Sequence, residues 1–193
     1  MVDLATLPAL LAAQDWPRAE KLLRRAAQKR DAPAEVFYNL AKVLEALDKP
    51  EQSRRWLKRA VTQRPGYASA WFELGRAALA SRDLPAARDA FARAARLDPA
   101  DADARRSLGR VALRLCDWDL AAQCFEGGED TEARHARYRI AAETGQAQAA
   151  DRAALWSDGS ARALTLRTLT RVARGTLPLR LRALDGTASE PLP

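Results

Sequence analysis

The sequence has very few of the residues on which metal and redox chemistry depend. Its 193 residues include one histidine, His135, and two cysteines, Cys116 and Cys124. The cysteines do not form a C-x-x-C pair, and a single histidine cannot complete a zinc or haem ligand set with them. We therefore expect no metal and no cofactor. We expect both cysteines to be reduced and mostly buried.

The sequence motifs of the common enzyme classes are also missing. There is no P-loop and no G-x-G-x-x-G, H-E-x-x-H or G-x-S-x-G pattern. No serine or cysteine nucleophile and no acid falls at a repeating position near His135, and a lone histidine on a helix is usually structural. We therefore assign no catalytic residue and expect that the protein is not an enzyme.

Helix breakers and long apolar runs are scarce. Nine glycines and ten prolines leave most of the chain to helix-forming residues. No stretch approaches the roughly 18 uncharged apolar residues of a membrane span. The first residues carry no basic segment, and Asp15 and Arg18 soon interrupt their apolar run, which argues against a secretory signal. We expect a helical protein of the cytoplasm.

Positive charge is in excess, with a net charge of +7. The stretch from Ser160 to Leu184 contains six arginines and no acid, so we assign nearly the whole excess to this tail and expect the rest of the chain to be close to balanced. Such a tail could bind nucleic acid or another anionic surface. It has no aromatic residue from Ala161 onward on which a base could stack. The six arginines are Arg162, Arg167, Arg171, Arg174, Arg180 and Arg182.

A 34-residue repeat organises most of the chain. In the window that starts at Ala68, Trp71, Leu74, Gly75 and Ala78 form one helical stripe. The windows that start at Ala34 and Ala102 carry large, small and turn residues at matching places. The second window continues with Asp83, Ala87, Phe91, Ala94 and Pro99, the first contains Phe37, Leu40, Ala41, Leu44, Leu57, Ala60 and Pro65, and the third contains Leu108, Gly109, Ala112, Asp117, Ala121 and Phe125.

The glycines of this stripe predict close contact between helices. A glycine inside a helix costs about 1 kcal/mol relative to alanine. Close approach of a second helix would compensate for that cost at Gly75, where the ring of Phe91 could fill the vacant space. Asp83 directly precedes the second helix of its window and can cap the free amides of that helix.

This pattern resembles the tetratricopeptide repeat family, whose 34-residue helix–turn–helix has the form W-x2-L-G-x2-Y…A-x3-F…P. The resemblance implies an all-α fold, a TPR-like α-solenoid in which antiparallel helix pairs form a right-handed superhelix of about four to five repeats. We place the array at residues 1–158, a capping helix at 159–175 and an extended basic arm with a disordered end at 176–193. In the capping helix, Leu166, Leu169, Val172 and Ala173 are expected on the buried side. The repeats span approximately 1–33, 34–67, 68–101, 102–130 and 131–158.

The resemblance also implies a function, because proteins of this family hold a partner segment on a concave face lined by the first helix of each pair. The ninth residue of each window is a cation, and aromatic or basic residues stand one turn earlier. A basic column beside aromatic rings suits an acidic or carboxylate-bearing segment. The competing interpretation is a solvated row of charges in an arginine-rich protein. The candidate partner-binding residues are Tyr38, Lys42, Phe72, Arg76, Arg106, Arg110, His135 and Arg139.

Two further predictions concern partners. The best-known acceptor of the family, a clamp for two carboxylates, also needs asparagines, and only Asn39 is present here. We therefore expect a protein or peptide partner but not that particular ligand. The alternating stretch of residues 177–182 could instead dock the chain as a regulatory subunit by adding a strand to a neighbour.

Overall fold

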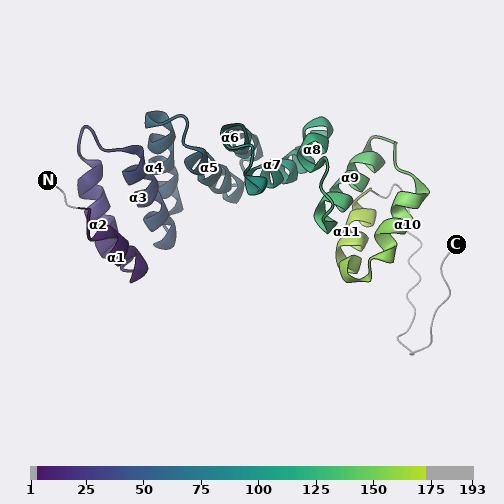
Figure 1. Ribbon diagram of the computed structural model, residues 1–193, viewed down its shortest axis with the longest axis horizontal. Helices are drawn as coiled ribbons and strands as arrows, with labels where there is room; N and C mark the ends of the chain where they lie inside the picture. The colour runs from purple at the N-terminus through teal and green to yellow at the C-terminus, as the bar shows by residue number, and fades with distance from the viewer. Residues whose placement is uncertain (1–3, 173–193) are drawn as a thin grey trace, which may run out of the picture. The chain divides into compact units, whose positions relative to one another are not determined.

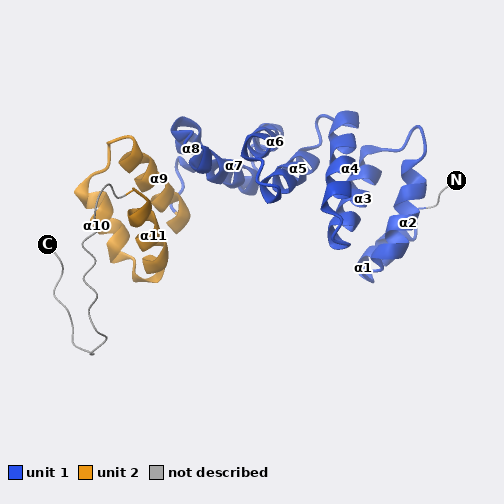
Figure 2. Cartoon of the chain, turned by 180° about the vertical axis from the view of Figure 1, so that it is seen from behind, with its two compact units in different colours: residues 1–129 blue, residues 130–193 orange. Residues whose placement is uncertain are grey.

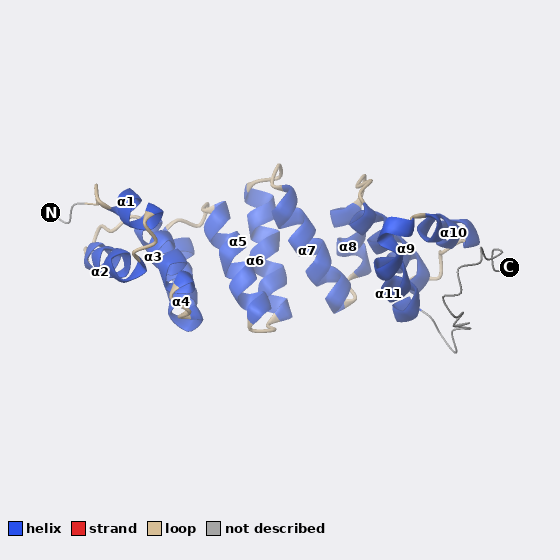
Figure 3. Ribbon diagram, turned by 90° about the horizontal axis from the view of Figure 1, so that it is seen from below, coloured by secondary structure: helices blue, strands red, loops and turns tan. Residues whose placement is uncertain are grey.

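The computed structural model describes residues 4–172. Within these residues the regular secondary structure is entirely helical, with no strand (Figures 1 and 3). The predicted all-α solenoid of antiparallel helix pairs is confirmed. The elements are α1 (Leu7–Ala12), α2 (Trp16–Ala27), α3 (Ala34–Ala46), α4 (Pro50–Gln63), α5 (Ala68–Ala80), α6 (Leu84–Leu97), α7 (Ala102–Leu115), α8 (Trp118–Phe125), α9 (Thr131–Glu143), α10 (Ala149–Ser157), the 3-10 turn η1 (Gly159–Ala161) and α11 (Arg162–Val172).

The chain divides into two compact units, residues 1–129 and residues 130–193 (Figure 2). Unit 1 contains α1 to α8, and the described part of unit 2 contains α9 to α11. The predicted arm at 176–193 and the end of the predicted capping helix at 173–175 lie outside the described residues.

The turn within each helix pair of unit 1 repeats in its backbone as well as in its sequence. Gln14, Asp48, Arg82 and Cys116 occupy the same place in successive repeats, and each has a left-handed φ between 53° and 60°. The residue that follows is Asp15, Lys49, Asp83 or Asp117, and each of the three aspartates accepts a hydrogen bond from a backbone N–H three residues on. The predicted cap at Asp83 is therefore confirmed, with Asp83 Oδ1 3.1 Å from the Ala86 nitrogen.

The predicted close approach at the repeat glycines is also confirmed. A methyl group built on Gly75 would lie 2.7 Å from ring carbons of Phe91. One built on Gly109 would lie 2.7 Å from the ring of Phe125. In both pairs the second helix therefore lies so close to the first that only a hydrogen atom fits between them.

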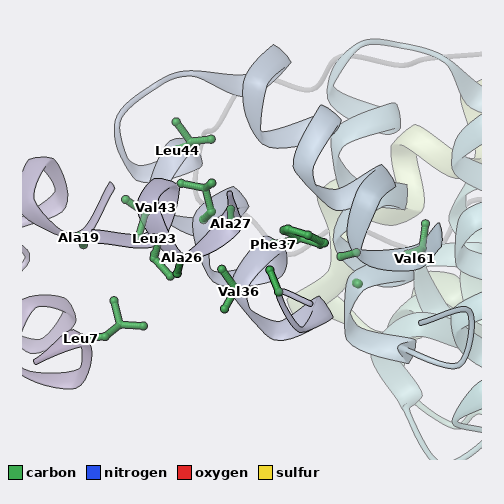
Figure 4. Packing of buried hydrophobic residues seen from close by; sticks show 14 residues of the cluster. Leu7, Ala19, Leu23, Ala26, Ala27, Val36, Phe37, Val43, Leu44 and Val61 are labelled. Carbon is green, nitrogen blue, oxygen red and sulfur yellow. The ribbon is translucent and has the colours of Figure 1, made fainter. Parts of the chain in front are cut away.

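The core of unit 1 follows the predicted stripes (Figure 4). Leu7, Leu23, Val43 and Leu44 bring α1, α2 and α3 together in one cluster of buried side chains. Trp71 packs at the edge of this cluster, and its indole N–H donates to the Pro65 carbonyl at 2.9 Å. A second cluster in α5 to α7 surrounds Phe91 and includes Ala78, Ala87, Leu108 and Val111.

Unit 2 packs α11 against α9 around a polar contact. His135 is only 3% exposed, and its Nε2 lies 2.9 Å from the Thr165 hydroxyl, which also lies 3.1 Å from the Leu155 carbonyl. Thr165, Thr168 and Leu169 are buried in α11, whereas Leu166 is 39% exposed. The predicted buried side of this helix is thus partly wrong, because α11 turns Thr165 inward to meet the histidine.

The prediction that both cysteines are mostly buried is wrong for one of them. Both thiols are free, but Cys116 is exposed, because it occupies the left-handed turn after α7 instead of a packed stripe. Cys124 is half-buried, and burial raises the pKa of its thiol.

Candidate partner-binding face

The first helices of the pairs in unit 1 carry the predicted column, and we call their outward side the first-helix face. Lys42 on α3 is half-buried, while Arg76 on α5 and Arg110 on α7 are exposed. They occupy the same place in successive helices because each is separated from the next by one full repeat. The sequence therefore placed these three cations correctly on one series of helices.

The column is not a row of free cations. The Lys42 ammonium lies 2.6 Å from a Glu45 carboxylate oxygen and 3.1 Å from one of Glu73. The Arg76 guanidinium lies 2.8 Å from Glu73 and 3.4 Å from Glu45. Burial alone would lower the pKa of Lys42, but its hydrogen bonds to the two glutamates outweigh burial and raise the pKa above its usual value. Two cations and two acids thus form a closed network across α3 and α5.

The aromatic residues predicted beside the column pack against other aromatic rings of the protein. Tyr38 is half-buried and lies 5.1 Å from Tyr67 between ring centroids. Phe72 is half-buried and lies 5.5 Å from Phe91. Arg106, at the corresponding place on α7, is also half-buried. These residues therefore offer only part of their side-chain surface to a ligand.

Two of the predicted residues belong to unit 2. His135 is wrong as a surface residue, because it is buried between α9 and α11, with Nδ1 2.6 Å from the Thr131 carbonyl. Arg139, one turn further along α9, is half-buried.

A depression of about 320 Å³ opens beside the column, between α3 and the α1–α2 pair. Four of its lining residues are apolar, and the three polar ones all come from α3. The sequence did not mark Leu11 and Trp16 as site residues, because the first repeat matches the 34-residue pattern only weakly. Leu11 nevertheless lies one full repeat before Glu45. The lining residues are Leu11, Trp16, Asn39, Lys42, Val43, Glu45 and Ala46.

Unit 2 has a smaller depression of about 260 Å³, lined by residues of α9, α10, α11 and the loop after α9. Tyr138, Leu169 and Val172 form part of its apolar wall, and Arg152 lies at its polar side.

Within residues 4–172, no group of three or more His, Cys, Asp or Glu side chains is placed to hold a metal ion. Among the described helices, none combines the length and the apolar character that crossing a bilayer requires.

Comparison with known families agrees with this architecture. Two family models described as tetratricopeptide repeat match residues 10–77 and 72–133, and so cover nearly all of unit 1. The chain is a member of the tetratricopeptide repeat family. No curated protein matches its sequence significantly.

Solved structures share the fold at low sequence identity. A tetratricopeptide repeat protein from Parabacteroides merdae is 13% identical with a TM-score of 0.69, over 88% of this chain and 70% of that one. MamA from Desulfovibrio magneticus is 14% identical with a TM-score of 0.61, over 86% and 88%. YrrB, described as a TPR protein with an unusual peptide-binding site, is 22% identical with a TM-score of 0.55, over 68% and 70%. At these sequence identities, the similarity shows a shared fold and nothing beyond the fold.

Proposed function

We propose that this protein is a non-catalytic scaffold that holds a segment of a partner protein on the first-helix face of unit 1. Membership of the tetratricopeptide repeat family supports the proposal, as does the structural similarity to YrrB, which is described as having a peptide-binding site. The single observation that carries it is the depression between α3 and the α1–α2 pair.

The depression suits one apolar side chain of an extended segment. Leu11, Trp16 and Val43 supply an apolar surface, and pockets of this kind orient a ligand with a few precisely placed polar groups. Asn39 is one of the lining residues, and among the described residues no side-chain hydrogen bond engages its amide. An asparagine amide can donate to and accept from the backbone of a bound segment.

An acidic or carboxylate-bearing partner is the finer part of the proposal. Glu45 and Glu73 already neutralise Lys42 and Arg76, so a carboxylate at that place would compete with two bound acids. We propose that the acidic end of the segment displaces Glu45 and Glu73 from Lys42 and Arg76 and extends along the same column to Arg106 and Arg110, with Tyr38 and Phe72 contributing part of their ring surface.

The matched pair Ala46→Glu and Ala80→Glu tests the site. Both alanines are exposed, and each is the last residue of a first helix, one repeat apart, but only Ala46 lines the depression. Peptides selected from a displayed random library on the full chain serve as probes in fluorescence anisotropy. Ala46→Glu should weaken their binding at least about tenfold, which corresponds to about 1.4 kcal/mol, and Ala80→Glu should leave it unchanged.

Equal effects of the two substitutions would argue against this site, and failure to select any peptide would argue against the function. The acidic preference is tested separately with Arg76→Glu combined with Arg110→Glu. This double substitution should abolish the binding of acidic peptides and leave helicity intact. Unchanged affinity would remove the acidic part of the proposal alone.

A further inference from the structure

Positive charge in unit 1 is concentrated in a single stretch. Residues 18–64 contain 13 arginines and lysines against six acids, an excess of seven that equals the net charge of the whole chain. Residues 98–129 contain four arginines against seven acids. The prediction that the excess lies in the tail and that the body is balanced therefore misses a strong asymmetry within the body.

Four exposed cations of this stretch lie on the outward sides of two neighbouring second helices. Lys21 and Arg25 are exposed one turn apart on α2, and Arg55 and Lys58 are exposed one turn apart on α4. The two helices lie on the same side of unit 1 (Figure 3), and Arg24 on α2 donates to Gln52 on α4. We call this surface the α2–α4 face.

Two acids of this stretch, Glu20 and Glu35, are already paired with other cations. Lys49 and Arg24 lie 2.7 Å and 2.8 Å from Glu20, and Arg64 lies 2.6 Å from Glu35. Burial alone would raise the pKa of Glu20, but these hydrogen bonds and charges hold the pKa below its usual value, so Glu20 stays ionised and paired.

The four cations of the α2–α4 face have no such neighbours. No carboxylate of the described residues lies within 4.0 Å of the charged nitrogens of Lys21, Arg25, Arg55 or Lys58. Their charge is therefore available to a partner.

The face lacks the apolar anchors on which other partners depend. Protein interfaces bury aromatic anchors near their centre, and surface helices that bind membranes insert apolar side chains. The only large hydrophobic residue exposed in the described part of the chain is Leu166, which belongs to unit 2. Single-stranded nucleic acid needs aromatic platforms, but Trp56 lies beneath the Arg59 guanidinium, 4.6 Å from it.

A nucleic-acid duplex needs none of these anchors. It carries about one negative charge per 1.7 Å of its axis, and cations that contact its phosphates gain affinity by releasing counterions. Successive cations on each helix of the face are one turn apart, about 5 to 6 Å, so each helix can contact more than one phosphate. We propose that the α2–α4 face binds the phosphate backbone of double-stranded nucleic acid without reading its sequence.

The test compares two fourfold variants of the full chain with the same net charge. The face variant is Lys21→Gln, Arg25→Gln, Arg55→Gln and Lys58→Gln. The control variant is Arg82→Gln, Arg88→Gln, Arg96→Gln and Arg114→Gln, all in α5 to α7 or the turns between them. Arg24 and Arg59 are kept, because they hydrogen-bond and stack within the fold. Circular-dichroism melting should show that both variants are as helical as the parent protein.

The probe is a labelled duplex DNA of about 20 base pairs, titrated by fluorescence anisotropy at several salt concentrations. Each lost phosphate contact removes about 0.9 from the slope of log K against log salt. In the face variant the negative slope should therefore become shallower by about 3 to 4. The affinity at low salt should fall by at least about tenfold. The control variant should change the affinity less than about twofold. The face variant should also lose affinity for a duplex RNA, because each nucleotide of RNA likewise carries one negatively charged phosphodiester.

Three results would overturn the proposal. The first is an equal loss of affinity in both fourfold variants, which would mean that net charge alone matters. The second is normal duplex binding by the face variant together with loss of binding when the six tail arginines are changed to glutamine. The third is tighter binding of the parent protein to poly-glutamate, or to vesicles of an anionic phospholipid, than to the duplex.

Discussion

The α3–α4 and α5–α6 pairs occupy the same place in the repeat and meet the same packing requirement with different residues. In α5–α6 the stripe has Gly75, and the ring of Phe91 lies where a Cβ would be. One repeat earlier the corresponding positions hold Ala41 and Leu57, both buried. A smaller residue on one helix thus accompanies a bulkier one on the other.

The difference shows that the family signature constrains the combined volume of the two facing side chains more than the identity of either one. Protein interiors are close-packed, so one added methyl group must be matched by a loss of volume nearby. The α7–α8 pair follows the α5–α6 solution with Gly109 and Phe125, but there a Cβ on the glycine would also lie 2.9 Å from the Cβ of Cys124. Three pairs therefore offer a graded series for mutation.

Removing the large partner should have the largest effect. Phe91→Ala leaves a cavity in place of a side chain that is 1% exposed, and buried phenylalanine to alanine changes cost about 3 to 5 kcal/mol. Urea unfolding should show this loss, and hydrogen exchange should place it in α5 to α7. A cost below about 1 kcal/mol would mean that the ring is not the packing centre of this pair.

Adding the missing methyl group should be the next largest change. Gly75→Ala gains about 1 kcal/mol of helix propensity, but overpacking against Phe91 costs typically about 1 to 3 kcal/mol. We expect a net loss of stability, measured by urea unfolding. Combining Gly75→Ala with Phe91→Leu reproduces the residues of the α3–α4 pair and should recover most of that loss. Absence of recovery would contradict the shared-volume interpretation.

The same double change in the next pair should recover less. In Gly109→Ala with Phe125→Leu, the smaller side chain relieves the contact with residue 125 but not the contact with Cys124. We expect a residual loss of about 1 kcal/mol relative to the α5–α6 double variant, within the range for a strained core. Equal recovery in both pairs would show that the Cys124 backbone moves freely.

The smallest expected effect concerns the start of the second helix. Asp83 caps α6, whereas Lys49, at the same place before α4, makes no side-chain cap. Asp83→Ala should therefore cost about 1 kcal/mol in thermal unfolding, and Lys49→Ala should cost nothing through capping. Because Lys49 also pairs with Glu20, Glu20→Gln is the control that separates its ion pair from the helix end.

The predictions from sequence that the structure confirms depend on short-range or periodic features. The stripe of Trp71, Leu74 and Gly75, the contact with Phe91 and the Asp83 cap each depend on residues whose spacing decides which side of a helix they occupy. The cations of the column were likewise placed on successive first helices. Spacing alone could not tell whether a cation at such a place pairs with an acid of a neighbouring helix or is exposed to water.

The features that were missed depend on which side chains meet across helices. Glu45 and Glu73 reach Lys42 and Arg76 from one turn away and from the neighbouring pair, so their effect appears only when α3 and α5 are placed side by side. His135 is buried because Thr165, on a helix that follows much later in the chain, turns toward it. The depression needs Leu11 and Trp16 from the first repeat, which matches the pattern only weakly, and it forms only where α1 and α2 pack beside α3.

By itself, the sequence determined the helices, their pairing, the turn that recurs once in every repeat and the complementary volumes at Gly75 and Phe91, because these follow from the pitch of the helix and the size of single side chains. Only the tertiary structure decided which cations are neutralised, which remain open on the α2–α4 face and where the surface is hollowed. Charge pairing and surface shape depend on distances between neighbouring helices, and a linear pattern of residues does not contain those distances.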